Sequence, residues 1–173
     1  MRFAYADPPY LGLAARFYGD RHPDAADYDE PAKHAELIER LCSDYDGWAM
    51  HLHTPSLRTI LPMCPEDVRV AAWCKSFASF KPGVNPVYAW EPVLFRSAGR
   101  SHDRTRQTVN DFCLVPITLE RGFQGAKPEA VVHWVMRMLG VQSTDTVEDL
   151  FPGSGAVQRA IDSWQRQAEL QLL

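Results

Sequence analysis

Short apolar runs alternate along the chain with stretches of helical periodicity, and proline, glycine or polar clusters separate them. The apolar runs are too short for helices, so they predict strands. Apolar residues three and four positions apart predict helices, as at Leu37, Ile38 and Leu41. The expected strands are residues 3–6, 47–53, 68–75, 88–95, 112–119 and 146–151. The expected helices begin at Pro31 behind an Asp29 cap, run from Thr54 to Pro62 and from Pro128 to Gly140, and start again after Gly155.

Strands and helices that alternate in this way indicate an α/β protein with a mostly parallel sheet. In the third expected strand, Val68, Val70 and Ala72 share one face. Residues 11–29 show no clear period, which predicts a long, mobile loop.

The length of 173 residues fits one domain, and the 46% of hydrophobic residues is ordinary for a globular protein. No apolar run is long enough to span a membrane. The first apolar run meets Asp7 and two prolines too early for a signal peptide. These features predict a cytoplasmic protein with no membrane partner.

Acidic residues outnumber basic ones by 22 to 18, which argues against coating nucleic acid by bulk attraction and leaves room for a local basic site. The four cysteines form no CxxC pair and have no histidine at zinc-ligand spacing. We therefore expect reduced thiols packed as small hydrophobes, and no metal.

The first motif that carries chemistry is Asp7-Pro8-Pro9-Tyr10, directly after an apolar run. Two prolines cannot continue a central strand, so a strand ends here and turns into a loop. Asp7 offers a carboxylate, Pro8 a carbonyl in a fixed direction, and Tyr10 a flat ring for stacking, while Pro9 stiffens the turn. Together these groups suit the amino group of a nucleobase, which has two N–H bonds in the plane of its ring.

The second motif is Asp-Leu-Phe-Pro-Gly-Ser-Gly at residues 149–155, between a strand and a helix. Its glycines let a ligand approach the backbone, and the helix N-terminus offers free N–H groups. The third glycine of a dinucleotide-binding GxGxxG motif is replaced by Gln158, which argues against NAD or FAD.

In this order the motifs resemble those of circularly permuted, β-class amino-methyltransferases, which act on adenine N6 or cytosine N4. The mRNA adenosine methyltransferases are permuted in the same sense. Residues 6–10 are similar to the catalytic motif of that family, and residues 149–155 to its S-adenosylmethionine motif. Lys127-Pro128 resembles the third cofactor motif. Further similarities are Trp73-Cys74-Lys75 and Glu91-Pro92-Val93-Leu94.

The resemblance implies a single-domain, Rossmann-like methyltransferase sheet, mostly parallel with one antiparallel strand and circularly permuted. It divides the chain into a catalytic half (1–96), a short arginine-rich loop region (97–126) and a cofactor-binding half (127–173). The two strands that carry the motifs are expected side by side, because ligands of open α/β folds bind beyond the carboxyl ends of neighbouring strands.

The implied activity is methyl transfer from S-adenosylmethionine to adenine N6 in DNA. Asp7 and the Pro8 carbonyl would accept the two N–H bonds and stabilise the charge that develops on nitrogen. Tyr10 would stack on a base that is flipped out or unpaired. The implied catalytic residues are Asp7, Pro8, Pro9 and Tyr10. The implied cofactor contacts are Ala6, Asp7, Pro8, Lys127, Asp149, Phe151, Gly153, Ser154 and Gly155.

Nucleic acid is the expected partner, and arginines in and beside the loop region are expected to contact phosphate. They are Arg96, Arg100, Arg104 and Arg106. The region is short for target recognition, so a second copy of the chain or a partner subunit that supplies it stays an open alternative.

Many enzymes of this family hold the cofactor ribose with an acidic residue on a strand after the last helix, and the sequence shows no such strand. We therefore expect weak cofactor binding or a partner that completes the site. The candidate substitutes are Gln158, Arg159, Gln165 and Gln167.

Other functions remain open at this point. The amino groups of adenine and cytosine present similar geometry, so cytosine N4 is an alternative target, and RNA is an alternative substrate. A non-catalytic subunit that keeps the fold and binds nucleic acid or a partner is the alternative outside the enzyme class.

Overall fold

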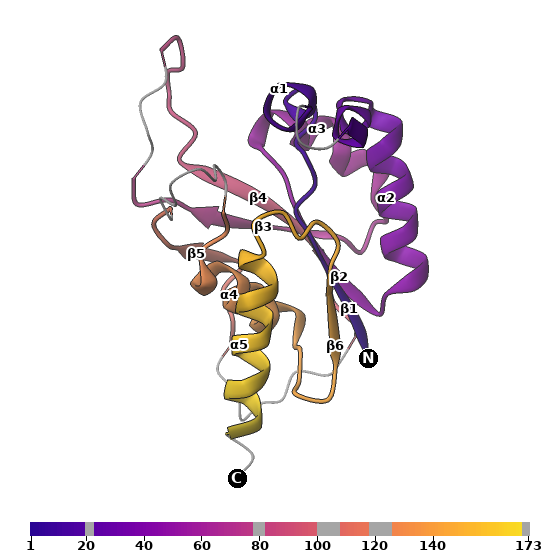
Figure 1. Ribbon diagram of the computed structural model, residues 1–173, viewed down its shortest axis with the longest axis vertical. Coiled ribbons are helices and arrows are strands. Elements are labelled where there is room, and N and C mark those ends of the chain that lie inside the picture. The colour runs from indigo at the N-terminus through magenta and orange to yellow at the C-terminus, as the bar shows by residue number, and fades with distance from the viewer. Residues whose placement is uncertain (20–22, 78–81, 100–107, 118–125, 171–173) are drawn as a thin grey trace.

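The computed structural model describes residues 1–19, 23–77, 82–99, 108–117 and 126–170. A six-stranded sheet with the order β5-β3-β4-β2-β1-β6 forms its centre. Figure 1 shows helices on both faces of this sheet. The strands are β1 (Arg2–Ala6), β2 (Gly47–His51), β3 (Arg69–Cys74), β4 (Trp90–Arg96), β5 (Phe112–Leu114) and β6 (Thr146–Asp149).

Long and short helices connect the strands in the described part of the chain. Proline at the start of α2, and just before α4, suits a first helical turn because its φ angle is already helical. Gly140 ends α4 in the left-handed conformation, with φ +73°. The α-helices are α1 (Ala14–Tyr18), α2 (Pro31–Asp44), α3 (Leu57–Ile60), α4 (Glu129–Leu139) and α5 (Ala156–Leu170).

The direction of the strands confirms the expected α/β class. β1 pairs in parallel with β2 on one side and with β6 on the other, and β3 pairs in parallel with β5. β4 runs antiparallel to both of its neighbours, β2 and β3. The sheet is therefore mostly parallel with one antiparallel strand.

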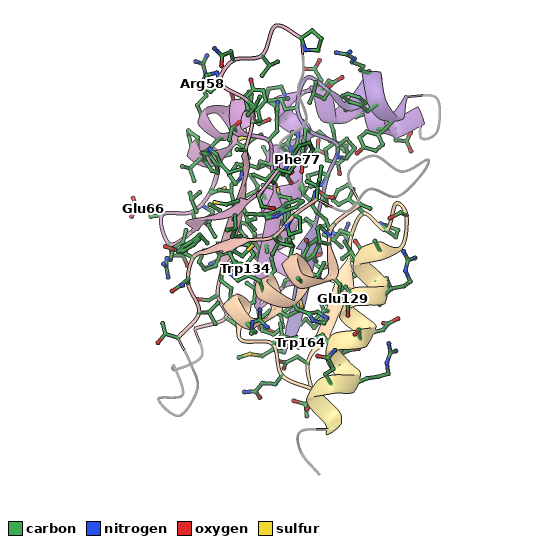
Figure 2. All side chains as sticks on the ribbon, turned by 90° about the vertical axis from the view of Figure 1, so that its left-hand side faces the viewer. Arg58, Glu66, Phe77, Glu129, Trp134 and Trp164 are labelled. Carbon is green, nitrogen blue, oxygen red and sulfur yellow. The ribbon has the colours of Figure 1, made fainter. Side chains whose placement is uncertain are left out.

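Alternate residues of β1 pack against opposite helical layers. Phe3 and Tyr5 face the core formed with α4 and α5, whereas Ala4 and Ala6 face the core formed with α2 and α3. A parallel strand that is buried on both faces appears in the sequence as a continuous apolar run, which is why β1 was predictable. Figure 2 shows the side chains that fill both layers.

Two expectations about residues 11–29 are wrong. The segment is not one loop, because it contains α1 and a 3-10 helix at Pro23–Asp29. Asp29 does not cap α2, whose N-cap is Glu30. Its carboxylate instead accepts the backbone N–H groups of Ala14 at 2.8 Å and Ala15 at 3.0 Å. These donors have no partner within a helix, so Asp29 satisfies the start of α1.

The face of β3 that carries Val70 and Ala72 is the less buried of its two faces. Ala71 and Trp73 are the buried residues of this strand, with 2% and 3% exposure, and Val70 on the other face is 37% exposed. Trp73 packs into the cluster with α4 and donates its indole N–H to the carbonyl of Val115 at 2.8 Å. One large aromatic side chain thus decides which face of the strand is buried.

Candidate functional site

The two motifs meet because their strands are neighbours in the sheet. In the parallel pairing of β1 with β6, Tyr5 is opposite Asp149, and the Leu150 N–H donates to the Tyr5 carbonyl at 3.0 Å. The turn that follows β1 and the glycine turn that follows β6 therefore leave the sheet at the same edge. The expected adjacency of these strands is confirmed.

The turn after β1 holds Tyr10 in a network of polar groups. The Tyr10 hydroxyl donates to Glu91 Oε1 at 2.6 Å and lies 3.4 Å from Asp7 Oδ1. Its ring stacks on the ring of His53, with centroids 5.5 Å apart and planes 5° from parallel. The two prolines between Asp7 and Tyr10 fix the turn, so both side chains are presented on one side of it.

Lys127 completes this network from the segment that leads into α4. Its buried Nζ lies 2.9 Å from Asp7 Oδ1 and 3.1 Å from Glu91 Oε1, and it donates to the Tyr10 hydroxyl at 3.1 Å. The sequence predicted Lys127 as a cofactor contact. The structure places it on the carboxylate of Asp7, the residue expected to receive the substrate.

Burial and opposite charges act against each other in this cluster. Burial alone would raise the pKa of the Glu91 carboxyl, but Lys127 and Lys75 hold it well below its ordinary value. Lys75 Nζ donates to Glu91 Oε2 at 2.7 Å. Burial lowers the pKa of Lys127, and the carboxylates of Asp7 and Glu91 outweigh it and hold that pKa above its ordinary range. Glu91 and Lys127 therefore both carry their charges at neutral pH.

A second buried pair lies beneath the turn. The Tyr5 hydroxyl shares a hydrogen bond of 2.7 Å with His51 Nε2, and both residues are 0% exposed. Burial, followed by the negative charges of Asp7 and Glu91, holds the pKa of Tyr5 well above its ordinary value. Burial lowers the pKa of His51. Both rings are consequently neutral. His51 Nδ1 lies 3.7 Å from Glu91 Oε1, so this uncharged pair borders the charged cluster.

The glycine turn after β6 leaves one carboxylate oxygen unused. Asp149 Oδ1 accepts the backbone N–H of Phe151 at 3.1 Å, whereas Oδ2 is buried and has no partner among the described residues. Burial raises the pKa of Asp149, and the charge of Asp7 adds to that increase. Gly153 and Gly155 have φ angles of +39° and +73°, which other residues rarely adopt.

The remaining predicted cofactor residues lie close to these groups. Ala6 ends β1 and is fully buried. Phe151 packs its ring edge against Tyr28, with centroids 5.4 Å apart. Ser154 accepts the Ala156 N–H at 3.4 Å, at the start of α5.

Arg96, one of the predicted phosphate contacts, lies away from this site. Arg96 is paired with Trp48 in the register of β4 with β2, at the end of the sheet opposite to Asp7, and its Nε donates to Asp67 at 2.7 Å. Arg100, Arg104 and Arg106 lie outside the described residues.

Of the four candidate substitutes for an acidic ribose contact, only one touches the glycine turn. Arg159 Nη1 donates to the Ser154 carbonyl at 3.1 Å. The side chains of the others bond to groups away from the turn. They are Gln158, Gln165 and Gln167.

Sequence reasoning missed the acidic and aromatic partners of the cluster. Glu91 entered only as part of a resemblance, although a single carboxylate inside a buried apolar strand is itself a signal of a paired charge. The stacking of His53 on Tyr10 had no signal in the sequence. Within the described residues no group of three or more His, Cys, Asp or Glu side chains is suited to hold a metal ion. None of the helices there combines the length and apolar character needed to cross a membrane.

Comparisons with known proteins identify the fold. No protein-family model matches the sequence, and no curated protein is similar enough to match. Among solved structures, the M1.HpyAVI–SAM complex superposes with a TM-score of 0.61 at 14% identity, over 95% of this chain and 78% of that chain. M1.HpyAVI alone gives 0.59 at 15% identity, over 95% and 76%.

A third solved structure agrees with these two. A protein of Thermus thermophilus assigned as a DNA modification methylase gives a TM-score of 0.58 at 16% identity, over 95% of this chain and 77% of that chain. At such identities the likeness shows that the chain has the fold of these proteins.

Proposed function

We propose that the chain is an S-adenosylmethionine-dependent methyltransferase that acts on the N6 amino group of adenine in DNA. One observation carries this proposal: the Asp7 turn and the glycine turn follow neighbouring parallel strands and leave the sheet at the same edge. The shared fold with the M1.HpyAVI–SAM complex supports the cofactor. The shared fold with the Thermus thermophilus protein assigned as a DNA modification methylase supports the DNA substrate.

The residues of the glycine turn fit S-adenosylmethionine. The partnerless Oδ2 of Asp149 is an acceptor for a ligand that carries an ammonium group and ribose hydroxyls. A Cβ at Gly153 would meet only the Phe151 carbonyl oxygen, at 3.7 Å, so the bare backbone leaves room for a ligand. Phe151, Ser154 and Ala6 would border the same ligand. When bound, the cofactor supplies an electrophilic methyl group on a positively charged sulfur.

The turn after β1 would prepare the amino group to accept that methyl. An aromatic amine is a weak nucleophile because its lone pair is delocalised into the ring. Asp7 and the Pro8 carbonyl each accept one N–H bond, which favours a tetrahedral nitrogen and stabilises its developing positive charge. The new C–N bond forms as the C–S bond breaks, and the nitrogen then releases a proton to solvent. Alignment by the rigid Pro8-Pro9 turn supplies much of the remaining rate enhancement.

Lys127 would prepare Asp7 for this role. Both Lys127 and Tyr10 approach Asp7 through Oδ1, so Oδ2 is the oxygen that an incoming amino group reaches without displacing them. The ion pair also holds the carboxylate in one orientation at little cost in entropy. In this arrangement Lys127 positions Asp7 rather than contacting the cofactor.

A second candidate function rests on the same ion pair. If the charge of Lys127 makes Asp7 too weak an acceptor for an amino group, the chain is a non-catalytic subunit that binds nucleic acid or a partner. Cytosine N4 and RNA are the alternative targets for an active enzyme, since both offer an amino group with two N–H bonds.

The test is incubation with methyl-labelled S-adenosylmethionine and, separately, duplex DNA, single-stranded DNA and RNA. Mass spectrometry of the digested nucleosides identifies the modified atom. The proposal expects label on adenine N6 in DNA. Label on cytosine N4 or in RNA would assign one of the alternative substrates. Binding of the cofactor without transfer to any polynucleotide would favour the non-catalytic subunit.

A further inference from the structure

An open hollow borders the connection between β3 and β4. Its volume is about 420 Å³, which lies in the range of roughly 300–1,000 Å³ that small-molecule sites occupy. Residues 83–88 form most of its wall, together with Thr54 and Trp90. Figure 1 shows this connection rising beyond the end of β4.

Two aromatic rings of the wall are exposed to water. Tyr88 is 50% exposed and Trp90 is 39% exposed. Val87, which precedes Tyr88 in the same wall, is 41% exposed. Large rings left open to solvent in a concave surface indicate a binding site, because burying them would be favourable. Flat rings in such a place suit a flat ligand.

The hollow begins one residue away from the catalytic cluster on two separate elements. Thr54 follows His53, whose ring stacks on Tyr10. Trp90 precedes Glu91, whose Oε1 accepts the Tyr10 hydroxyl. Successive side chains of a strand point to opposite faces, so Trp90 and Glu91 diverge, and the hollow lies beside the cluster rather than within it. A hollow in this place suits the neighbour of a base that is held against Tyr10.

The charges and polar groups of the wall fit a polynucleotide. Residues 53–63 and 82–90 contain no aspartate or glutamate, in a chain whose net charge is −4. Arg58 is exposed on α3 and lies toward the same end of the molecule (Figure 2). The Asn85 amide can both donate to and accept from a base edge. The buried Thr54 hydroxyl has no partner among the described residues.

We propose that this hollow binds the unpaired base next to the target adenine, by stacking on Tyr88 and Trp90, and that the substrate is therefore single-stranded DNA or an opened stretch of duplex. The inference rests on the proposed function for the identity of the target base. Paired bases are already stacked on their neighbours, so only an unpaired strand offers a free face to these rings.

The experiment measures binding of a fluorescein-labelled, adenine-containing single-stranded DNA by fluorescence anisotropy, and then of its blunt duplex. Tyr88→Ala and Trp90→Ala are each expected to weaken single-strand binding about tenfold. Tyr88→Phe and Trp90→Phe keep a ring and are expected to bind the single strand with an affinity within about threefold of wild type. These variants keep the inference testable if the alanine variants do not fold. Phe112→Ala is the matched control, because Phe112 is 54% exposed on β5 and borders a different hollow.

The wild-type protein is expected to bind the single strand at least about tenfold more tightly than the duplex. Equal affinity for the two forms, or alanine variants that bind as wild type does, would overturn the inference. If labelled S-adenosylmethionine gives methylation but Tyr88→Ala and Trp90→Ala leave KM for DNA unchanged, the enzyme proposal stands and this one fails. If no methylation occurs but single-strand binding depends on the two rings, the enzyme proposal fails and the base-binding hollow stands.

Discussion

Lys127 Nζ lies 2.9 Å from Asp7 Oδ1, so the segment that leads into α4 is bonded to the turn that follows the first strand. Both side chains are largely removed from water, at 4% and 20% exposure. The contact joins the turn after β1 to the segment before α4 at a single carboxylate. Glu91 and Tyr10 share the same lysine, so four side chains from three parts of the sequence act as one unit.

Replacement of Lys127 tests how much this unit stabilises the fold. Lys127→Met leaves the carboxylates of Asp7 and Glu91 without their shared cation, and breaking a buried ion pair in this way costs about 3–5 kcal/mol. Urea unfolding is expected to show that loss. Lys33→Met is the control, because Lys33 pairs with Glu36 at the surface, and its unfolding midpoint should not move. A midpoint unchanged in Lys127→Met would mean that the cluster is solvated.

The low pKa of Glu91 predicts a pH dependence of stability. A carboxyl whose pKa is lowered by folding adds stability above its ordinary pKa of 4.5, and this stability is lost as the pH falls through the lower pKa of the folded protein. The difference in unfolding free energy between wild type and Glu91→Gln should therefore be largest near pH 6 and shrink below pH 4.5. Denaturant titrations from pH 6 to pH 3 measure it. A constant difference over that range would show that Glu91 gains nothing from its lysines.

Removal of the Tyr10 hydroxyl separates its polar role from its ring. Tyr10→Phe removes the donor to Glu91 Oε1 and the acceptor for Lys127, and keeps the ring that stacks on His53. We expect a stability loss of about 1–3 kcal/mol from the unsatisfied buried groups. In the methylation assay kcat should fall about tenfold with KM for DNA little changed, whereas Tyr10→Ala should raise KM as well. Equal KM values in the two variants would argue against stacking of the base on this ring.

Glycine substitution tests the turn after β6. Gly155 has a φ angle of +73°, so Gly155→Ala strains the backbone by about 1 kcal/mol. Its Cβ would also lie 3.1 Å from Arg159 Nη1. Isothermal titration should show S-adenosylmethionine binding weakened about tenfold. Gly140→Ala is the matched control, with the same φ angle and open space around the added methyl. If both variants bind the cofactor equally well, the turn is not its site.

The strands and long helices were predictable from sequence because each depends mainly on its own residues. β1 is a continuous apolar run, and α4 is bounded by Pro128 and by Gly140 in a left-handed conformation. The adjacency of the two motifs also followed from general rules for open sheets. Residues 11–29 were mispredicted because α1 has only five residues and is satisfied by Asp29 from outside the helix.

The candidate site was less predictable because its contacts are long-range. Asp7 and Tyr10 were recognised from their motif, but their bonding partners come from β4 and from the segment before α4. No local sequence pattern predicts that Lys127, 120 positions after Asp7, contacts the Asp7 carboxylate. The contact of Lys127 with Asp7 was therefore not predicted, and Lys127 as a cofactor contact stays a prediction.

The central claim is that Asp7 accepts the amino group that becomes methylated. The direct measurement is transfer of labelled methyl from saturating S-adenosylmethionine to single-stranded DNA by Asp7→Asn, compared with Asp44→Asn at the exposed end of α2. Loss of one acceptor that stabilises the transition state is expected to reduce kcat by about 100-fold or more, while the folded structure is retained and Asp44→Asn matches wild type. Undiminished transfer by Asp7→Asn would contradict the account.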